Sequence, residues 1–99
     1  MYKYEVYIGL SIKNSDKILN NQSIIVDFGQ YFDLSAQECL GVYTLDNGQK
    51  IYENTIKLTI LSETEDIDGK LVKLIKQKKE EYQQESILLT KQKIKAVFI

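Results

Sequence analysis

The chain opens with a stretch in which apolar and polar side chains alternate. One face of this stretch carries Tyr2, Tyr4, Val6, Ile8 and Leu10, and the other carries Lys3, Glu5, Tyr7 and Gly9. A period of two residues is typical of a strand that buries one of its faces. The pattern therefore predicts a half-buried first strand over residues 2–11.

Two later segments carry apolar residues at helical spacing. The first segment has Ile24, Ile25, Phe28, Tyr31 and Phe32. The second has Ile67, Leu71, Leu74, Ile75, Lys78 and Tyr82. Spacings of three and four residues place such side chains on one stripe of a helix. We predict a short first helix, weakened by Gly29, and a longer second helix over Ile67–Tyr82. Asp68 is a candidate N-cap of the second helix, and Thr64 or Asp66 would also serve.

A hairpin is predicted between the two helices. Cys39–Leu45 and Ile51–Leu61 are strand-like and flank Asn47-Gly48. Asn-Gly is the favoured pair for a two-residue type I′ turn, because both positions need a positive φ. With this turn, Tyr43 lies opposite Tyr52, Gly41 opposite Asn54 and Cys39 opposite Ile56, and Cys39 faces the core.

The closing segment is expected to add one or two more strands. Residues 86–90 and 93–99 are strand-like and are joined by Lys91 and Gln92. The order strand, helix, hairpin, helix, strand predicts an α+β fold, in which a ferredoxin-like antiparallel sheet of four or five strands packs both helices on one face. The 99 residues suffice for one core, so a single α+β domain over 1–99 is expected.

Helices on one side of a sheet leave its other face uncovered, and this face is the predicted contact surface. The residues predicted to bind a partner are Tyr7, Leu40, Val42, Ile51, Glu53, Lys57, Lys93 and Lys95. Its apolar members, Tyr7, Leu40, Val42 and Ile51, form a candidate interface of a homo-oligomer. Scattered surface apolar residues are the alternative. Lys91, Lys93 and Lys95 with Tyr7 are also suited to a nucleotide, unless these lysines only protect an edge strand from aggregation.

Composition removes several classes of chemistry. The chain has no His, all 13 basic residues are Lys, and its formal net charge is -1. Ser-His and Cys-His nucleophile pairs are therefore excluded, and a nucleic-acid partner is not expected. The acidic run over 63–69 lacks the spacing of a calcium loop, so neither a metal nor a cofactor is expected.

The same features indicate a compartment. Cys39 has no second cysteine with which to form an internal disulfide, which agrees with a reducing environment. No apolar stretch approaches bilayer length, and the alternating first ten residues do not form a secretory signal. We therefore expect the protein in the cytoplasm of the cell that makes it, with no membrane partner.

Short motifs in order along the chain resemble an uncharacterised family of small phage and bacterial proteins. The matching positions are Tyr7, Gly9 and Leu10 in an aromatic-x-Gly-Leu opening, Gly41 and Glu53 in a Gly-bearing hairpin followed by a Glu, and Gln84, Glu85 and Ser86 in a closing Gln-Glu-Ser motif. The resemblance implies a fold and a phage setting rather than a reaction. A Lys-, Ile- and Asn-rich chain without Arg also resembles the products of AT-rich phage genomes.

These observations lead to a functional hypothesis. We expect a non-enzymatic phage counter-defence protein that inhibits a host immune system, either CRISPR or nucleotide signalling, by blocking a host immune protein or sequestering a nucleotide second messenger. A structural or regulatory accessory protein acting through protein contacts is the alternative. A carboxylate-dependent nuclease of cyclic nucleotides requires that Glu53 and Glu85 converge with Gln84 and Ser86, whose simpler role is structural bracing.

Overall fold

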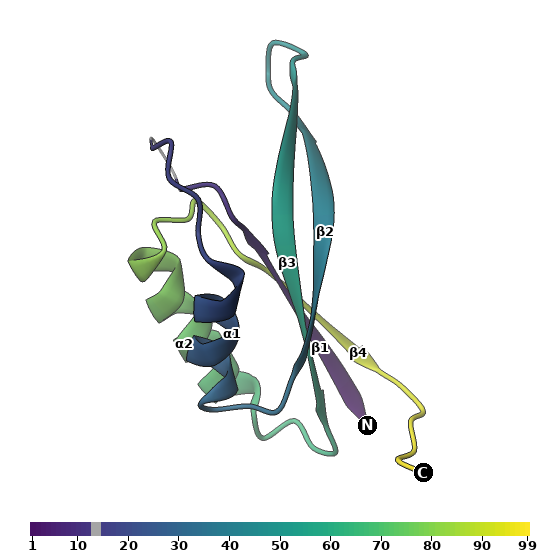
Figure 1. Cartoon of the computed structure of the whole chain (residues 1–99). Helices are drawn as coiled ribbons and strands as arrows, with labels where there is room; N and C mark the ends of the chain where they lie inside the picture. Colours follow the sequence, from purple (N-terminus) through teal and green to yellow (C-terminus); the bar gives the residue numbers. More distant parts are fainter. Residues whose placement is uncertain (13–14) are drawn as a thin grey trace.

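The computed structural model describes residues 1–12 and 15–99 and contains four strands and two helices. In chain order they are β1 (Tyr2–Gly9), α1 (Asn21–Gly29), β2 (Ser35–Thr44), β3 (Lys50–Ser62), α2 (Asp68–Glu81) and β4 (Leu88–Lys93). The strands form one antiparallel sheet in the order β2-β3-β1-β4. Both helices cover the same face of this sheet (Figure 1). The predicted ferredoxin-like α+β fold is therefore confirmed.

The core lies between the helices and the covered face of the sheet. Tyr4, Val6 and Ile8 of β1 are buried there, as their alternation predicted. The other main contributors are Ile24, Phe28, Ile56, Leu58, Ile60, Leu71, Leu74 and Ile75. Full burial of such a side chain stabilises the fold by about 1.5–3 kcal/mol. No helix in the described part of the chain is long and apolar enough to cross a membrane.

The two helices begin in different ways. The Asn20 side chain accepts a hydrogen bond from the Ser23 backbone N–H at 3.1 Å and caps α1. The prediction that Asp68 caps α2 is wrong, because the cap position is Ile67, which makes no side-chain cap bond. The Asp68 carboxylate instead accepts hydrogen bonds from the Tyr4 hydroxyl and, at 2.6 Å, from the Lys91 ammonium. Burial and this carboxylate raise the pKa of Tyr4 to about 12.

The predicted two-residue turn of the hairpin is wrong. The Leu45 N–H donates to the Gln49 carbonyl at 2.8 Å, and the Gly48 N–H donates to the Leu45 carbonyl at 2.9 Å. Residues 46–48 therefore form a three-residue loop in which Gly48 has a φ of 86° and Asn47 has no positive φ. A type I turn followed by one left-handed glycine gives this geometry.

The longer loop shifts the pairing of β2 and β3 by one residue. Tyr43 lies opposite Ile51 and Cys39 opposite Thr55, so every side chain of β2 lies on the face opposite to the predicted one. Leu40 and Val42 are consequently on the helix side of the sheet, and Cys39 is on the uncovered face. Leu40 and Val42 are still 62% and 52% exposed, because the hairpin extends past the helices (Figure 1).

The end of the chain also differs from the prediction. A single strand, β4, replaces the two expected strands, and Lys91 and Gln92 lie inside it. Lys93 pairs with Tyr2, which puts it on the helix side of the sheet, and Lys95 lies beyond the strand. Lys91 pairs with Tyr4 of β1, and its ammonium group forms ion pairs with Glu65 and Asp68. The predicted placement of Lys93 on the uncovered face is therefore wrong, and Lys95 is not part of the sheet.

A matched pair of glycine substitutions tests the loop geometry. Gly48→Ala should lower the free energy of unfolding by about 1 kcal/mol, because a Cβ disfavours a positive φ. Gly69→Ala lies in α2 with open space around it and should leave stability unchanged or raise it by up to about 1 kcal/mol. Urea denaturation measures both. Equal effects of the two substitutions would contradict the three-residue loop.

Candidate functional site

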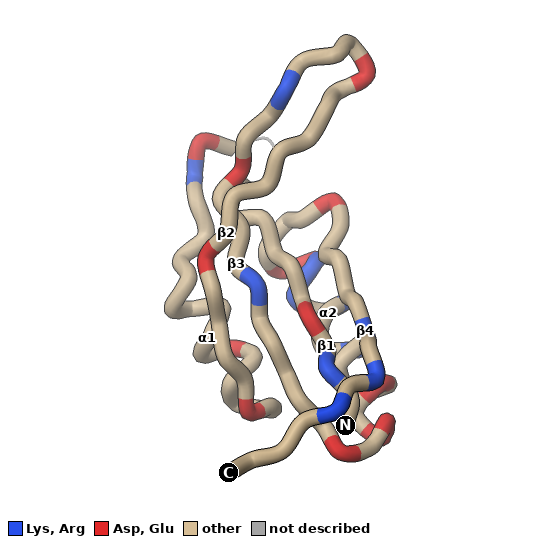
Figure 2. Tube along the Cα trace, turned by 90° about the vertical axis from the view of Figure 1, so that its right-hand side faces the viewer, with Lys and Arg blue, Asp and Glu red and all other residues tan. Residues whose placement is uncertain are grey.

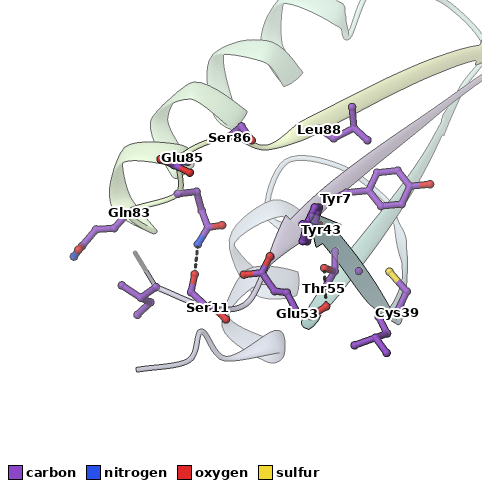
Figure 3. A pocket seen from close by; sticks show the side chains of 15 residues that line it. Tyr7, Ser11, Cys39, Tyr43, Glu53, Thr55, Gln83, Glu85, Ser86 and Leu88 are labelled. Carbon is purple, nitrogen blue, oxygen red and sulfur yellow. Dashed lines mark hydrogen bonds between the residues drawn. The ribbon is translucent and has the colours of Figure 1, made fainter. Parts of the chain in front are cut away.

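A hollow of about 670 Å³ opens on the uncovered face, around the C-terminal end of β1. It is lined by Tyr7, Gly9, Ser11, Ile12, Cys39, Leu40, Gly41, Tyr43, Glu53, Thr55, Gln83, Gln84, Glu85, Ser86 and Leu88. Figure 3 shows Glu53 entering from one side and Glu85 and Ser86 from the other. The hollow therefore joins β1, β2 and β3 to the segment that links α2 to β4.

Only some of the residues predicted for binding lie at this hollow. Tyr7, Leu40 and Glu53 line it, whereas Val42, Ile51, Lys57, Lys93 and Lys95 do not. Cys39 was predicted to face the core and lines the hollow instead, because the pairing of β2 is shifted. The same shift brings Tyr43 to the hollow. Gln83 carried no signal in the sequence.

The positions that matched the family motifs meet in space. Gly9, Gly41, Glu53 and the segment 84–86 come from three distant parts of the chain, and all of them line the hollow. Structural bracing was the simpler expectation for Glu53 and for this segment. These positions therefore lie together at the hollow, whereas Leu10 of the opening motif is buried in the core.

The end of α2 brings the closing motif to the hollow. Gln83 has a φ of 54°, the left-handed region that a non-glycine residue rarely adopts. The Gln84 N–H donates to the Lys79 carbonyl at 3.0 Å and the Gln83 N–H to the Glu80 carbonyl at 3.1 Å, which is a Schellman motif. The Gln84 side-chain amide then donates to the Ser11 carbonyl at 3.0 Å (Figure 3). The chain therefore turns sharply at Gln83, and the Gln84 side chain bonds it to the segment that follows β1.

The hollow is acidic. Glu53 and Glu85 contribute carboxyl groups, and among residues 1–12 and 15–99 no lysine belongs to the lining. Lys57 lies on the same face of the sheet but pairs with Glu5 at 3.4 Å. The Tyr7 hydroxyl donates to the same carboxylate at 3.1 Å, and burial, together with Glu5, raises the pKa of Tyr7. Tyr7 therefore stays neutral, and the groups lining the hollow favour a cationic or neutral ligand over an anion.

Polar uncharged groups complete the lining. Hydroxyls come from Ser11, Ser86 and Thr55, of which the Thr55 hydroxyl donates to the Glu53 carbonyl at 3.4 Å. Cys39 adds a free, half-buried thiol. Within residues 1–12 and 15–99, no three acidic or cysteine side chains are close enough to hold a metal ion. The hollow can thus hold a polar organic molecule through hydrogen bonds and carboxylate contacts.

Comparisons with known proteins identify two similar structures. No protein-family model and no curated protein matches the chain. A phage SAM lyase in complex with S-methyl-5′-thioadenosine is 28% identical, with a TM-score of 0.67, and the match covers 92% of this chain and 79% of that chain. A phage SAM lyase in the apo state is 27% identical, with a TM-score of 0.71, and the match covers 92% of this chain and 78% of that chain.

These similarities correct the functional expectation. Both similar proteins are phage proteins, in agreement with the expected phage origin. Both are enzymes, so the expectation of a non-enzymatic protein that blocks a host protein or sequesters a nucleotide is contradicted. The absence of His excluded only His-dependent nucleophile pairs, and an enzyme remained among the alternatives as a carboxylate-dependent nuclease.

The left-handed residue at the end of α2 gives a testable prediction. Gln83→Gly should raise the free energy of unfolding by up to about 1 kcal/mol, because glycine adopts a positive φ without steric cost. Gln83→Ala keeps that cost and should change stability much less. Thermal denaturation of the two variants compares them. A Gln83→Gly protein less stable than Gln83→Ala would contradict the assignment.

Proposed function

We propose that this protein is a phage lyase that cleaves S-adenosylmethionine (SAM) and releases S-methyl-5′-thioadenosine. The observation that carries the proposal is the likeness to two phage SAM lyases over 92% of the chain at 27% and 28% identity. The hollow on the uncovered face supports it, because its groups suit the charges of SAM.

The charges of SAM favour an acidic site. SAM has a sulfonium and an α-ammonium group, both positive, and one carboxylate. Glu53 and Glu85 supply two carboxyl groups at the hollow. The same lining is unsuited to the phosphates of a nucleotide second messenger, which proteins usually bind through Arg, Lys or backbone N–H groups. Charge therefore favours SAM over the phosphorylated ligands first considered.

The reaction needs no cofactor. The bond between the sulfonium sulfur and the γ-carbon of the methionine part breaks, and its electron pair stays on sulfur, which becomes the neutral thioether of S-methyl-5′-thioadenosine. The substrate's own carboxylate can attack the γ-carbon and close a five-membered lactone without any proton transfer. Elimination would instead require a protein base. We favour the internal attack, because its nucleophile is part of the substrate and needs no proton transfer to a carboxylate of the hollow.

We assign to Glu53 the binding of the α-ammonium group of SAM. The charge on sulfur disappears as the bond breaks, so an acid paired with the sulfonium would stabilise the substrate more than the transition state. The ammonium keeps its charge throughout the reaction. An acid that holds the ammonium also fixes the neighbouring carboxylate for attack, which favours catalysis.

The proposed activity agrees with an anti-host-defence role in infected cells. Host enzymes that modify DNA with methyl groups take those groups from SAM. Destroying SAM would deprive such enzymes of their substrate without any contact between this protein and a host protein. The proposal therefore keeps the expected counter-defence role. It replaces the blocking of a host immune protein with the destruction of a host metabolite, SAM.

We further propose that the chain forms a homo-oligomer through the β2–β3 hairpin. Leu40, Val42 and Tyr52 are 62%, 52% and 67% exposed on its helix-side face. From residue 39 to residue 52 the hairpin has only two charged residues, Asp46 and Lys50, and it stands clear of the helices (Figure 2). A protruding apolar surface of this kind is typical of a protein contact.

The activity itself is tested with the purified full chain and SAM. Liquid chromatography with mass spectrometry should detect S-methyl-5′-thioadenosine and a lactone of the four-carbon fragment. Glu53→Gln should lower kcat/KM by about 100-fold, since it removes a charged partner but keeps the shape of the side chain. Glu63→Gln, an exposed acid outside the hollow, is the matched control and should stay within about twofold of wild type. Absence of the thioether with folded wild-type protein would refute the proposal.

The oligomer is tested by mass. Leu40→Asp combined with Val42→Asp should convert the oligomer to monomer in native mass spectrometry, because burying two carboxylates in an apolar contact is strongly unfavourable. Ile18→Asp, at a residue 69% exposed outside the hairpin, is the control and should leave the mass unchanged. A monomeric wild-type protein would exclude the proposed contact.

A further inference from the structure

The place of the Glu53 carboxylate depends on its neighbours in the sheet. Glu53 lies on β3, the strand between β1 and β2. Gly41 of β2 is its direct pairing partner, and Gly9 of β1 pairs with Thr55, two residues along the same face. Glu53 therefore has a residue without a side chain on each side. Cross-strand neighbours of this kind would otherwise be within contact distance.

The Glu53 carboxylate occupies the space where a side chain of residue 9 would begin. A Cβ added at Gly9 would lie less than 3 Å from all three atoms of the Glu53 carboxyl group, closer than Cβ atoms come to any atom in real structures. Gly9 is not one of the residues with a positive φ, so its backbone does not require glycine. Glycine is therefore needed at residue 9 because it has no side chain, which leaves room for the Glu53 carboxylate.

Gly41 has a different neighbour. A Cβ there would lie 2.8 Å from the Tyr43 hydroxyl oxygen and 3.0 Å from two ring atoms. Tyr43 therefore lies over Gly41, and Glu53 lies over Gly9, although both glycines border the same acid. The two glycines thus hold two different side chains at the hollow.

We propose that Gly9 is a positioning residue that sets the Glu53 carboxylate for the reaction, an inference that rests on the proposed SAM lyase function. Without a Cβ at residue 9, the carboxylate lies against the backbone of β1, in the position that a side chain would take. Any side chain at residue 9 lifts or rotates the acid out of that position. A displacement of about 1 Å in a reacting geometry costs about 100-fold in rate.

A double-mutant cycle tests this inference. Gly9→Ala should lower kcat/KM for SAM by about 100-fold. Glu53→Asp shortens the acid by one methylene and makes room for the added methyl group. The losses of kcat/KM caused by the two substitutions should therefore not multiply. The double variant, with both Gly9→Ala and Glu53→Asp, should be no less active than the Glu53→Asp variant. The inference would be overturned if the losses of kcat/KM in the two single variants multiplied in the double variant. It would also be overturned if kcat/KM of Gly9→Ala stayed within about threefold of the wild-type value.

Gly41→Ala is the matched control. Its Cβ meets Tyr43 and not Glu53, so Glu53→Asp should not compensate for it and the two effects should multiply. Gly69→Ala, which has open space around its Cβ, should leave kcat/KM unchanged. Thermal denaturation of each variant separates loss of activity from loss of the fold. Compensation of Gly41→Ala by Glu53→Asp would overturn the inference.

A structural readout separates this inference from the proposed function. Crystal structures of wild type and Gly9→Ala should show the carboxylate against residue 9 in the first and moved away from it in the second. If wild type does not cleave SAM but the acid moves as expected, the lyase proposal fails and the role of Gly9 in placing the acid stands. If SAM is cleaved and the acid stays in place in Gly9→Ala, the role of Gly9 fails alone.

Discussion

The pairing of β3 with β1 on one side and β2 on the other determines where every side chain of the site lies. Because side chains alternate along a strand, a slip of one residue would send Glu53 to the helix side and bring Asn54 to the uncovered face. The buried residues of β1 and β3 oppose such a slip, since it would expose the core. The same packing that stabilises the fold therefore also places the Glu53 side chain on the uncovered face.

The sequence predicted the elements with strong periodicity. The alternation of β1 and the stripes of α1 and α2 each extend over two or more periods, and the order of elements then restricted the topology. The hairpin pairing was not predictable in the same way. Asn47-Gly48 fits a two-residue loop with two positive φ angles and also a three-residue loop with one, and only the structure distinguishes them.

The site was predicted in part. Glu53 and Tyr7 follow from the alternation of β3 and β1, and the motif positions pointed to Gly9, Gly41 and the segment 84–86. Their convergence depends on a contact between Gln84 and Ser11, which are 73 residues apart. A pattern of neighbouring residues in the sequence cannot predict a contact between residues so far apart. Lys91 was misplaced for a similar reason, because its partners Glu65 and Asp68 lie in another part of the chain.

The hollow combines residues from both ends of the chain, namely Tyr7–Ile12 and Gln83–Leu88. The second group is held beside the first because β4 pairs with β1 along the edge of the sheet. The side chains of β4 are exposed or half-buried, whereas β1 and β3 contribute most of the buried strand residues of the core. Local opening at this edge would therefore take the hollow apart while the centre of the sheet stays folded.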